Sequence, residues 1–280
     1  MSVEKIRVLR IINRFNLGGP TFNVAYLTKY MDDKFETLLL GGTKDETEAS
    51  SEFILYDLGI KPKVISEMKR AISLSSDYKS YKEIAKVIQE FKPHIAHTHA
   101  AKSGVLGRLA AINNDVPIIL HTFHGHVFHS YFGEAKTLIY KSIERYLAKR
   151  STRIIAISQI QSDELSLIHK IADYSKVEIV HLGFDLSRFQ ENQSEKRNIF
   201  RDKYGLKDGE IAIGIIGRLV PIKNHKMFLD AVNPVFEQNP NTRFFVIGDG
   251  ESKDELLGYC QKSNIPYKWL EAPDMDSPLC

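Results

Sequence analysis

Histidines gather in two short stretches of the chain, HTHAAKS from His97 to Ser103 and HTFHGH from His121 to His126. Each stretch follows an apolar run that predicts a strand. In a sheet of parallel strands, ligands bind outside the carboxyl ends, so these histidines are candidate site residues. A polar side chain that is satisfied structurally near a strand end would explain any one of them as well, and both interpretations stay open.

A second candidate site lies in the sequence GRLVPIKNH, which runs from Gly217 to His225. A predicted strand delivers Gly217 and Arg218 at its carboxyl end, and Lys223 stands just before a predicted helix, whose N-terminus favours anions. Two cations at this spacing suit a diphosphate leaving group. A solvated basic loop is the alternative.

Glycines between the first predicted strand and the first helix allow a further phosphate contact. Gly18-Gly19-Pro20 lets backbone N–H groups approach a phosphate at the start of that helix, although a tight turn would need the same residues. The dinucleotide fingerprint G-x-G-x-x-G is missing, and the second strand ends in Gly41-Gly42 where an acidic ribose ligand would stand. A nicotinamide-dependent dehydrogenase is therefore disfavoured.

Strands and helices that could position these residues alternate along the first part of the chain. The predicted strands are Ile6–Ile12, Phe35–Leu40, His94–His97, Ile118–His121, Arg153–Ile157 and Val177–Val180. The predicted helices are Tyr78–Phe91, Ser103–Ile112, Glu134–Lys149 and Gln159–Ile171. Such alternation requires a parallel sheet with right-handed crossovers, which predicts a doubly wound α/β domain over residues 1–185.

The pattern restarts after a polar stretch, residues 186–209, which reads as a linker with a short helix. Residues 210–280 then carry strand Glu210–Gly217, helix Asn224–Gln238, strand Arg243–Ile247 and helix Ser252–Gln261. This part is short for a doubly wound domain, so we expect an incomplete second Rossmann-like domain. The tail, Glu271–Cys280, has two prolines and no periodicity, and predicts an unstructured end.

Composition excludes several classes of protein. The formal net charge of +3 is too small for a nucleic-acid binder, and no stretch has the roughly 20 apolar residues of a membrane span. Two cysteines, Cys260 and Cys280, provide neither a disulfide framework nor metal-ligand spacing, so we expect a cytoplasmic protein without a metal site.

Several of these motifs, in this order, resemble the retaining glycosyltransferases of family 4, which have the GT-B fold. The resemblance runs from about Ile6 to about Tyr267. It rests on seven stretches: Gly18-Gly19-Pro20; His97-Thr98-His99 with Lys102-Ser103-Gly104; His121 to Gly125; Ile155 to Ser158; Gly183-Phe184-Asp185; Gly217 to Lys223; and Ile247 to Gly250.

The resemblance implies roles for particular residues. Arg218 and Lys223 would neutralise the diphosphate of a nucleotide sugar, Gly18, Gly19 and Gly248 would belong to the nucleotide-sugar site, and His124 would lie beside the transferred sugar. In such enzymes the N-terminal domain mainly holds a saccharide or lipid-linked glycan acceptor, and the C-terminal domain holds the nucleotide sugar. Transfer proceeds with retention and without an essential metal or other cofactor.

One family motif has no counterpart here. The E-x7-E pair that contacts the sugar and the ribose is absent, since Glu271 is the last glutamate and Leu279 stands eight residues later. Two hypotheses follow: a glycosyltransferase of polysaccharide biosynthesis, or a truncated and inactive relative that acts as a binding module or is a gene remnant.

The predicted helix Glu134–Lys149 indicates a membrane contact as well. Leu138, Ile139, Ile143, Tyr146 and Leu147 predict its buried stripe. Lys141, Arg145 and Lys149 recur every four residues on another face, which could lie against anionic lipid at the inner membrane face. A solvated face with Glu144 as the counter-charge would show the same pattern.

Overall fold

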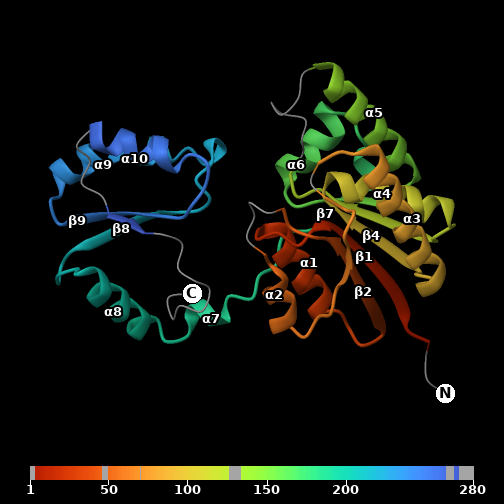
Figure 1. Ribbon diagram of the computed structural model, residues 1–280, viewed down its shortest axis with the longest axis horizontal. Coiled ribbons are helices and arrows are strands. Elements are labelled where there is room, and N and C mark those ends of the chain that lie inside the picture. Colours follow the sequence, from red (N-terminus) through yellow and green to blue (C-terminus); the bar gives the residue numbers. More distant parts are fainter. Residues whose placement is uncertain (1–3, 46–49, 70, 126–133, 263–267, 271–280) are drawn as a thin grey trace. The chain divides into compact units, whose positions relative to one another are not determined.

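The computed structural model describes residues 4–45, 50–69, 71–125, 134–262 and 268–270. The chain forms two compact units, Met1–Asp185 and Leu186–Cys280 (Figure 1). His126 and the tail Glu271–Cys280, both discussed above, lie outside the described residues. Each unit is treated separately below.

A parallel seven-stranded sheet forms the centre of the first unit, in the order β3-β2-β1-β4-β5-β6-β7. Its strands are β1 (Ile6–Arg14), β2 (Phe35–Gly42), β3 (Lys63–Ile65), β4 (Ile95–His99), β5 (Ile118–Thr122), β6 (Arg153–Ala156) and β7 (Val177–Ile179). The doubly wound α/β prediction is confirmed. Strand β3 was not predicted, because three residues that begin with a lysine carry no detectable alternation.

Helices cover both faces of this sheet (Figure 1). Leu9 and Ile11 of β1 pack with α3 (Leu74–Phe91) and α4 (Ala101–Asn113). Their neighbour Ile12 packs on the other face, with α1 (Gly19–Lys29) and α2 (Glu52–Asp57). Both faces are buried, which explains the continuous apolar run in β1.

The glycines that end β2 are required by close packing. A Cβ on Gly42 would stand 1.8 Å from the carbonyl oxygen of Met68, and one on Gly41 would stand 2.6 Å from the ring of Phe15. Backbone and a buried ring cannot move aside cheaply. These two glycines therefore serve packing.

Helix α5 (Glu134–Arg150) buries a different face from the one predicted. Of the five residues expected in its buried stripe, only Leu147 is buried, whereas Leu138 and Ile139 are 62% and 60% exposed and Ile143 and Tyr146 are also exposed. The cause is Arg108 of α4, which is fully buried and pairs with Glu144 at 2.6 Å. This ion pair draws the Glu144 face of α5 inward, so the predicted role of Glu144 as a solvated counter-charge is wrong.

The helix predicted over Gln159–Ile171 is shorter than expected. Helix α6 (Gln159–Asp163) passes into a π-helical turn, Glu164–Ile168, and Lys170 then adopts φ of +51°. The left-handed residue ends the helix, and Ile171 returns to the core.

The second unit holds a parallel sheet in the order β10-β9-β8. Its elements are α7 (Ser187–Gln190), α8 (Gln193–Tyr204), β8 (Ile211–Ile216), α9 (His225–Gln238), β9 (Thr242–Ile247), α10 (Lys253–Lys262) and β10 (Lys268–Leu270). Helix α8, inside the expected linker, packs on this sheet: the rings of Phe200 and Phe245 lie 5.3 Å apart, and Arg201 donates to the carbonyl of Glu210 at 3.0 Å. The described part of this unit is a small, partial α/β domain.

Candidate functional site

Three of the histidines in the two predicted loops lie in strands and are buried, and two of them, His97 and His121, are also the last residues of the predicted strands. His97 and His99 belong to β4 and His121 to β5, and their exposed fractions are 7%, 0% and 0%. The predicted strands end too early, because a histidine inside an apolar run looks like the start of a loop. These three side chains are therefore part of the core of the first unit.

His121 lies on the face covered by α4. Its Nδ1 is 2.8 Å from the hydroxyl of Thr98, and its ring is so close to α4 that a Cβ on Gly104 would stand 2.5 Å from it. Burial, together with the charge of Arg108, holds the pKa of His121 well below its ordinary value. This histidine packs two elements together, and the structural interpretation is the better one for it.

His97 and His99 lie on the opposite face, toward α1. Arg10 of β1 bonds Nδ1 of His97 at 2.8 Å and donates from its second terminal nitrogen to the carbonyl of Leu27 in α1. The rings of His97 and His99 are in contact, with centroids 4.1 Å apart and planes tilted by 35°. The sheet thus separates His121 from the other two.

His124, the predicted sugar-side residue, follows β5 and is partly buried. Its Nε2 lies 3.0 Å from Nδ1 of His99, and the two ring centroids are 5.3 Å apart. Burial lowers the pKa of His124 to about 4, so the ring is neutral near pH 7. His99 lies directly behind His124 and had no assigned role in the sequence.

Gly18 and Gly19 begin α1. The carbonyl of Gly18 accepts from the N–H of Thr21 at 3.1 Å, no side chain caps the helix, and its first turn has no acidic residue. A Cβ placed on Gly19 would meet nothing within 4 Å. Among the described residues, no side chain caps the amino end of α1 or occupies the space beside Gly19, as an approaching anion would require.

Arg218 and Lys223 flank the loop that follows β8 in the second unit, and both are exposed. Pro221–Lys223 form one 3-10 turn, and α9 begins two residues after Lys223. Within the described residues, neither cation has a carboxylate at ion-pair distance. Two uncompensated cations before a helix N-terminus make a strongly anion-attracting loop.

Gly248 supports this loop through backbone packing. It follows β9 with φ of +148°, and a Cβ there would stand 2.0 Å from the carbonyl oxygen of Gly217. The N–H of Leu219 donates to the carbonyl of Asp249 at 2.9 Å, and the carbonyl of Leu219 accepts from Ser252 at 3.0 Å. Gly248 thus sets the position of the segment that carries Arg218.

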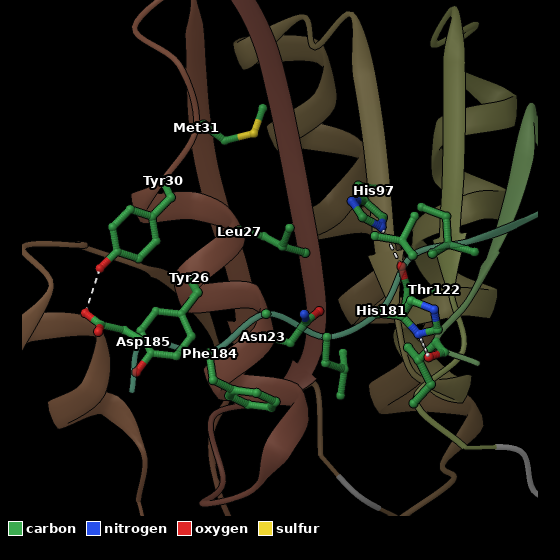
Figure 2. A pocket seen from close by; sticks show the side chains of 15 residues that line it. Asn23, Tyr26, Leu27, Tyr30, Met31, His97, Thr122, His181, Phe184 and Asp185 are labelled. Carbon is green, nitrogen blue, oxygen red and sulfur yellow. Dashed lines mark hydrogen bonds between the residues drawn. The ribbon is translucent and has the colours of Figure 1, made fainter. Parts of the chain in front are cut away.

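A hollow of about 620 Å³ lies elsewhere in the first unit, between α1 and the segment after β7 (Figure 2). His97 and Thr122 line it, and on its rim the hydroxyl of Tyr30 donates to Asp185 at 3.0 Å. Phe184 lies with its ring edge toward Tyr26. The Gly183-Phe184-Asp185 motif therefore packs on α1, a contact for which the sequence carried no signal.

Two classes of feature were not found in the described ranges. No group of three histidine, cysteine, aspartate or glutamate side chains there could hold a metal ion. No helix there is both long and apolar enough to span a bilayer.

Known protein families match both parts of this chain. The family description Glycosyltransferase Family 4 matches residues 17–188, and Glycosyl transferases group 1 matches residues 196–269. The chain belongs to glycosyltransferase family 4. The GT-B-like fold, which the sequence predicted, is confirmed by the solved structures described below.

Curated relatives are glycosyltransferases, two of which are from bacteria. The UDP-Gal:alpha-D-GlcNAc-diphosphoundecaprenol alpha-1,3-galactosyltransferase of Escherichia coli is 33% identical over 202 residues, which are 71% of this chain and 52% of that protein. The capsular polysaccharide biosynthesis glycosyltransferase CapM of Staphylococcus aureus is 28% identical over 68% of this chain and 50% of its own length. The chain thus spans about half the length of these relatives.

Solved structures share the fold at low identity. Anabaena HepE, in complex with UDP and glucose, has a TM-score of 0.72 and 18% identity, with 97% of this chain and 70% of that one covered. UDP-GlcNAc 2-epimerase from Neisseria meningitidis has a TM-score of 0.64 and 13% identity, with 96% and 72% covered. Transferases and epimerases share this fold, so the family matches carry the assignment to the family.

Proposed function

We propose that this family 4 chain serves the transfer of a sugar from a nucleotide diphosphate to a saccharide or lipid-linked glycan acceptor, with retention. The observation that carries the proposal is the pair of exposed, uncompensated cations on the loop before α9. The Escherichia coli relative is a UDP-Gal transferase by name and HepE was solved in complex with UDP, which supports a UDP sugar. The inactive-relative hypothesis has no comparable observation in its favour.

In the proposed reaction, negative charge develops on the departing diphosphate and positive charge on the sugar, and both need stabilisation. The bond between the sugar carbon and the diphosphate oxygen breaks, the acceptor hydroxyl forms its bond on the same face, and its proton passes to the departing diphosphate. Arg218 and Lys223 bind that diphosphate, and the backbone at Gly18 and Gly19 contacts its oxygens. Gly248 positions the Arg218 segment, as its packing against Gly217 supports.

His124 takes the sugar side in this proposal. A positive charge develops on the sugar as the bond breaks, and an imidazolium beside it would oppose that charge. Because burial lowers the pKa of His124 to about 4, its ring is neutral and can contact the sugar without this penalty. We propose no metal and no cofactor, since the two cations and the backbone supply the stabilisation.

Calorimetric titration with UDP tests the phosphate assignment on this chain, with GDP as a comparison. Charge-assisted hydrogen bonds contribute roughly 1.5–3 kcal/mol each, so Arg218→Ala and Lys223→Ala should each weaken UDP binding by about 10- to 100-fold. Lys226→Ala is the matched control, because Lys226 is an exposed cation that already pairs with Asp230. Unchanged UDP binding in both site variants would show that the phosphate assignment is wrong.

Transfer itself is tested with a panel of UDP sugars and a lipid-diphosphate acceptor, beside His124→Ala. We expect product only where a UDP sugar and the acceptor are both present, and a strong loss of turnover in His124→Ala with UDP affinity unchanged. Product that forms with the opposite anomeric configuration would contradict the retaining mechanism.

We further propose that α5 lies against anionic lipid in a cytoplasmic, peripheral protein. Exposed Leu138 and Ile139 stand on the same helix as Lys141, Arg145 and Lys149, which is the pairing of apolar and basic residues that binds membrane surfaces. Co-sedimentation should show stronger binding to anionic than to neutral vesicles, and Leu138→Ser with Ile139→Ser should weaken it. Equal binding to both vesicle types would contradict the proposal.

A further inference from the structure

Arg10, His97, His99 and His124 form a continuous row from β1 through β4 to the segment after β5, and we call His97, His99 and His124 the imidazole row. Arg10 bonds His97 at 2.8 Å, the tilted rings of His97 and His99 have centroids 4.1 Å apart, and His99 bonds His124 at 3.0 Å. Arg10, His97 and His99 are buried. In such a row, hydrogen bonds between the side chains, and not solvent, decide which ring nitrogen carries the proton.

Arg10 fixes the proton of His97. A guanidinium only donates, so Nδ1 of His97 must accept and the ring proton must sit on Nε2. That Nε2 lies 2.8 Å from the hydroxyl oxygen of Thr122, which accepts it (Figure 2). Both nitrogens of His97 are therefore occupied, and its tautomer is determined.

Burial keeps the rest of the row uncharged, and Arg10 adds to this effect at His99. No carboxylate among the described residues pairs with Arg10, and its second hydrogen bond goes to the carbonyl of Leu27. Burial first, and then electrostatic interactions with His97 and Arg10, hold the pKa of His99 well below its ordinary value. The groups that act on His99 in this way are His97, Arg10, His124 and His121. The bond from His99 to His124 thus joins two neutral rings, of which only one can donate.

The unpartnered nitrogen of His99 decides the direction of that bond. Its Nε2 is buried without a hydrogen-bond partner in the described part of the chain. If His124 donated, the proton of His99 would sit on this Nε2, as a buried N–H with no acceptor. Orphaned buried N–H groups are rare and cost free energy. We therefore infer that Nε2 of His99 carries a lone pair, which the nearby charge of Arg10 favours, and not a proton.

We propose that His99 is a positioning residue that donates from Nδ1 to Nε2 of His124 and so fixes the His124 proton on Nδ1. His124 then offers a ligand one neutral N–H donor and no second acceptor. The use of that donor on the transferred sugar rests on the function proposed above. The tautomer itself is a property of this chain without any ligand.

Long-range ¹H–¹⁵N spectra of the ¹⁵N-labelled chain measure the tautomer of each histidine, because they distinguish an Nδ1–H from an Nε2–H imidazole. The His124 signal is assigned by its loss in His124→Gln. We expect His97 as the Nε2–H tautomer, and both His99 and His124 as Nδ1–H tautomers, from pH 5.5 to 8. An Nε2–H signal at His124 in the unchanged chain overturns the proposal.

Two variants separate positioning from general packing. His99→Asn keeps a side-chain N–H donor near the place of Nδ1, so His124 should stay Nδ1–H. His99→Phe removes the donor but keeps a ring, so His124 should become a mixture of tautomers and take up a proton at higher pH. An unchanged His124 spectrum in a folded His99→Phe overturns the proposal, and if that variant does not fold, the spectra of the unchanged chain and of His99→Asn decide.

These outcomes are independent of the proposed function. Weak or absent UDP binding would leave the tautomer assignment standing. An Nε2–H tautomer at His124 would leave the roles of Arg218 and Lys223 standing, since those residues belong to the other unit.

Discussion

Side chains at the carboxyl ends of β4 and β5 in the first unit are buried, whereas the cations after β8 in the second unit are exposed. His99 and His121 are each 0% exposed and are held by neighbouring side chains. Arg218 and Lys223 stand on a backbone-packed loop in solvent. Substitutions of the buried side chains in the first unit should therefore change the stability of the fold. Substitutions of the exposed cations in the second unit should change ligand binding without changing stability.

The largest effect should come from the buried ion pair that holds α5 to α4. Glu144→Gln leaves Arg108 charged and unpaired at 0% exposure, and breaking such a pair costs about 3–5 kcal/mol. The free energy of unfolding of the first unit, followed by hydrogen exchange of β4 and β5 in urea, measures this. Asp230→Asn, which breaks the exposed pair with Lys226, is the control in the second unit, followed at β8 and β9, and should cost that unit under about 1 kcal/mol. Equal losses for the two variants would contradict the comparison.

The stability of the first unit should also fall in mild acid. His124 has its pKa lowered to about 4 by burial, while an unfolded histidine titrates near 6.5. The unfolded chain therefore binds more protons between these values, so stability is complete above pH 6.5 and is lost as the pH falls toward 4. His124 alone accounts for about 3 kcal/mol of this loss.

Urea denaturation of the first unit from pH 4.5 to 8 measures that slope. His124→Ala should flatten it but not abolish it, since the pKa values of His97, His99 and His121 are also held well below their ordinary value by burial. A stability that is constant from pH 5 to 7 would show that these rings are not buried in neutral form.

The sequence predicted the order of elements well, because local periodicity marks strands and helices that are buried on a regular face. It failed where a tertiary contact decided the outcome. Arg108 turned α5 by drawing in Glu144, and no pattern within α5 could reveal a partner 36 residues away. It also ended the strand that carries His97 too early and left His99 in a loop. Nothing local shows that Arg10 and Thr122 bond His97, or that Thr98 bonds His121, inside the sheet.

In the second unit, the loop itself was predictable, because Gly217 and Pro221 mark its turn and its cations are close in sequence. The contact that supports the loop was not, since it joins Gly217 to Gly248 across two strands. The His99–His124 bond and the hollow beside α1 escaped prediction for the same reason. Each of them joins segments that are distant in the sequence and that only the order of strands in the sheet brings together.

A smaller effect should come from Gly248→Ala in the second unit. A methyl group 2.0 Å from the carbonyl of Gly217 must displace backbone, at a cost of about 1–3 kcal/mol. Gly214→Ala is the matched control, because its new Cβ would stand 3.6 Å from its nearest neighbour, an ordinary contact. Gly248→Ala should lower the stability of the second unit and UDP affinity together, while Gly214→Ala changes neither. Retained stability and affinity in Gly248→Ala would show that the loop does not depend on this packing.

The smallest effect on stability should come from the two cations of the loop. Substitutions at exposed positions without partners usually change the free energy of unfolding by less than about 0.5 kcal/mol, and Arg218 and Lys223 are exposed with no ion pair among the described residues. Removing one of two neighbouring like charges also relieves repulsion, so Arg218→Ala and Lys223→Ala should leave stability unchanged or slightly raised. Urea denaturation without nucleotide, followed by hydrogen exchange of β8 and β9, measures this beside the UDP titration. A loss above 1 kcal/mol in either variant would mean that the cation holds the loop together, and the separation of binding from stability in the second unit would fail.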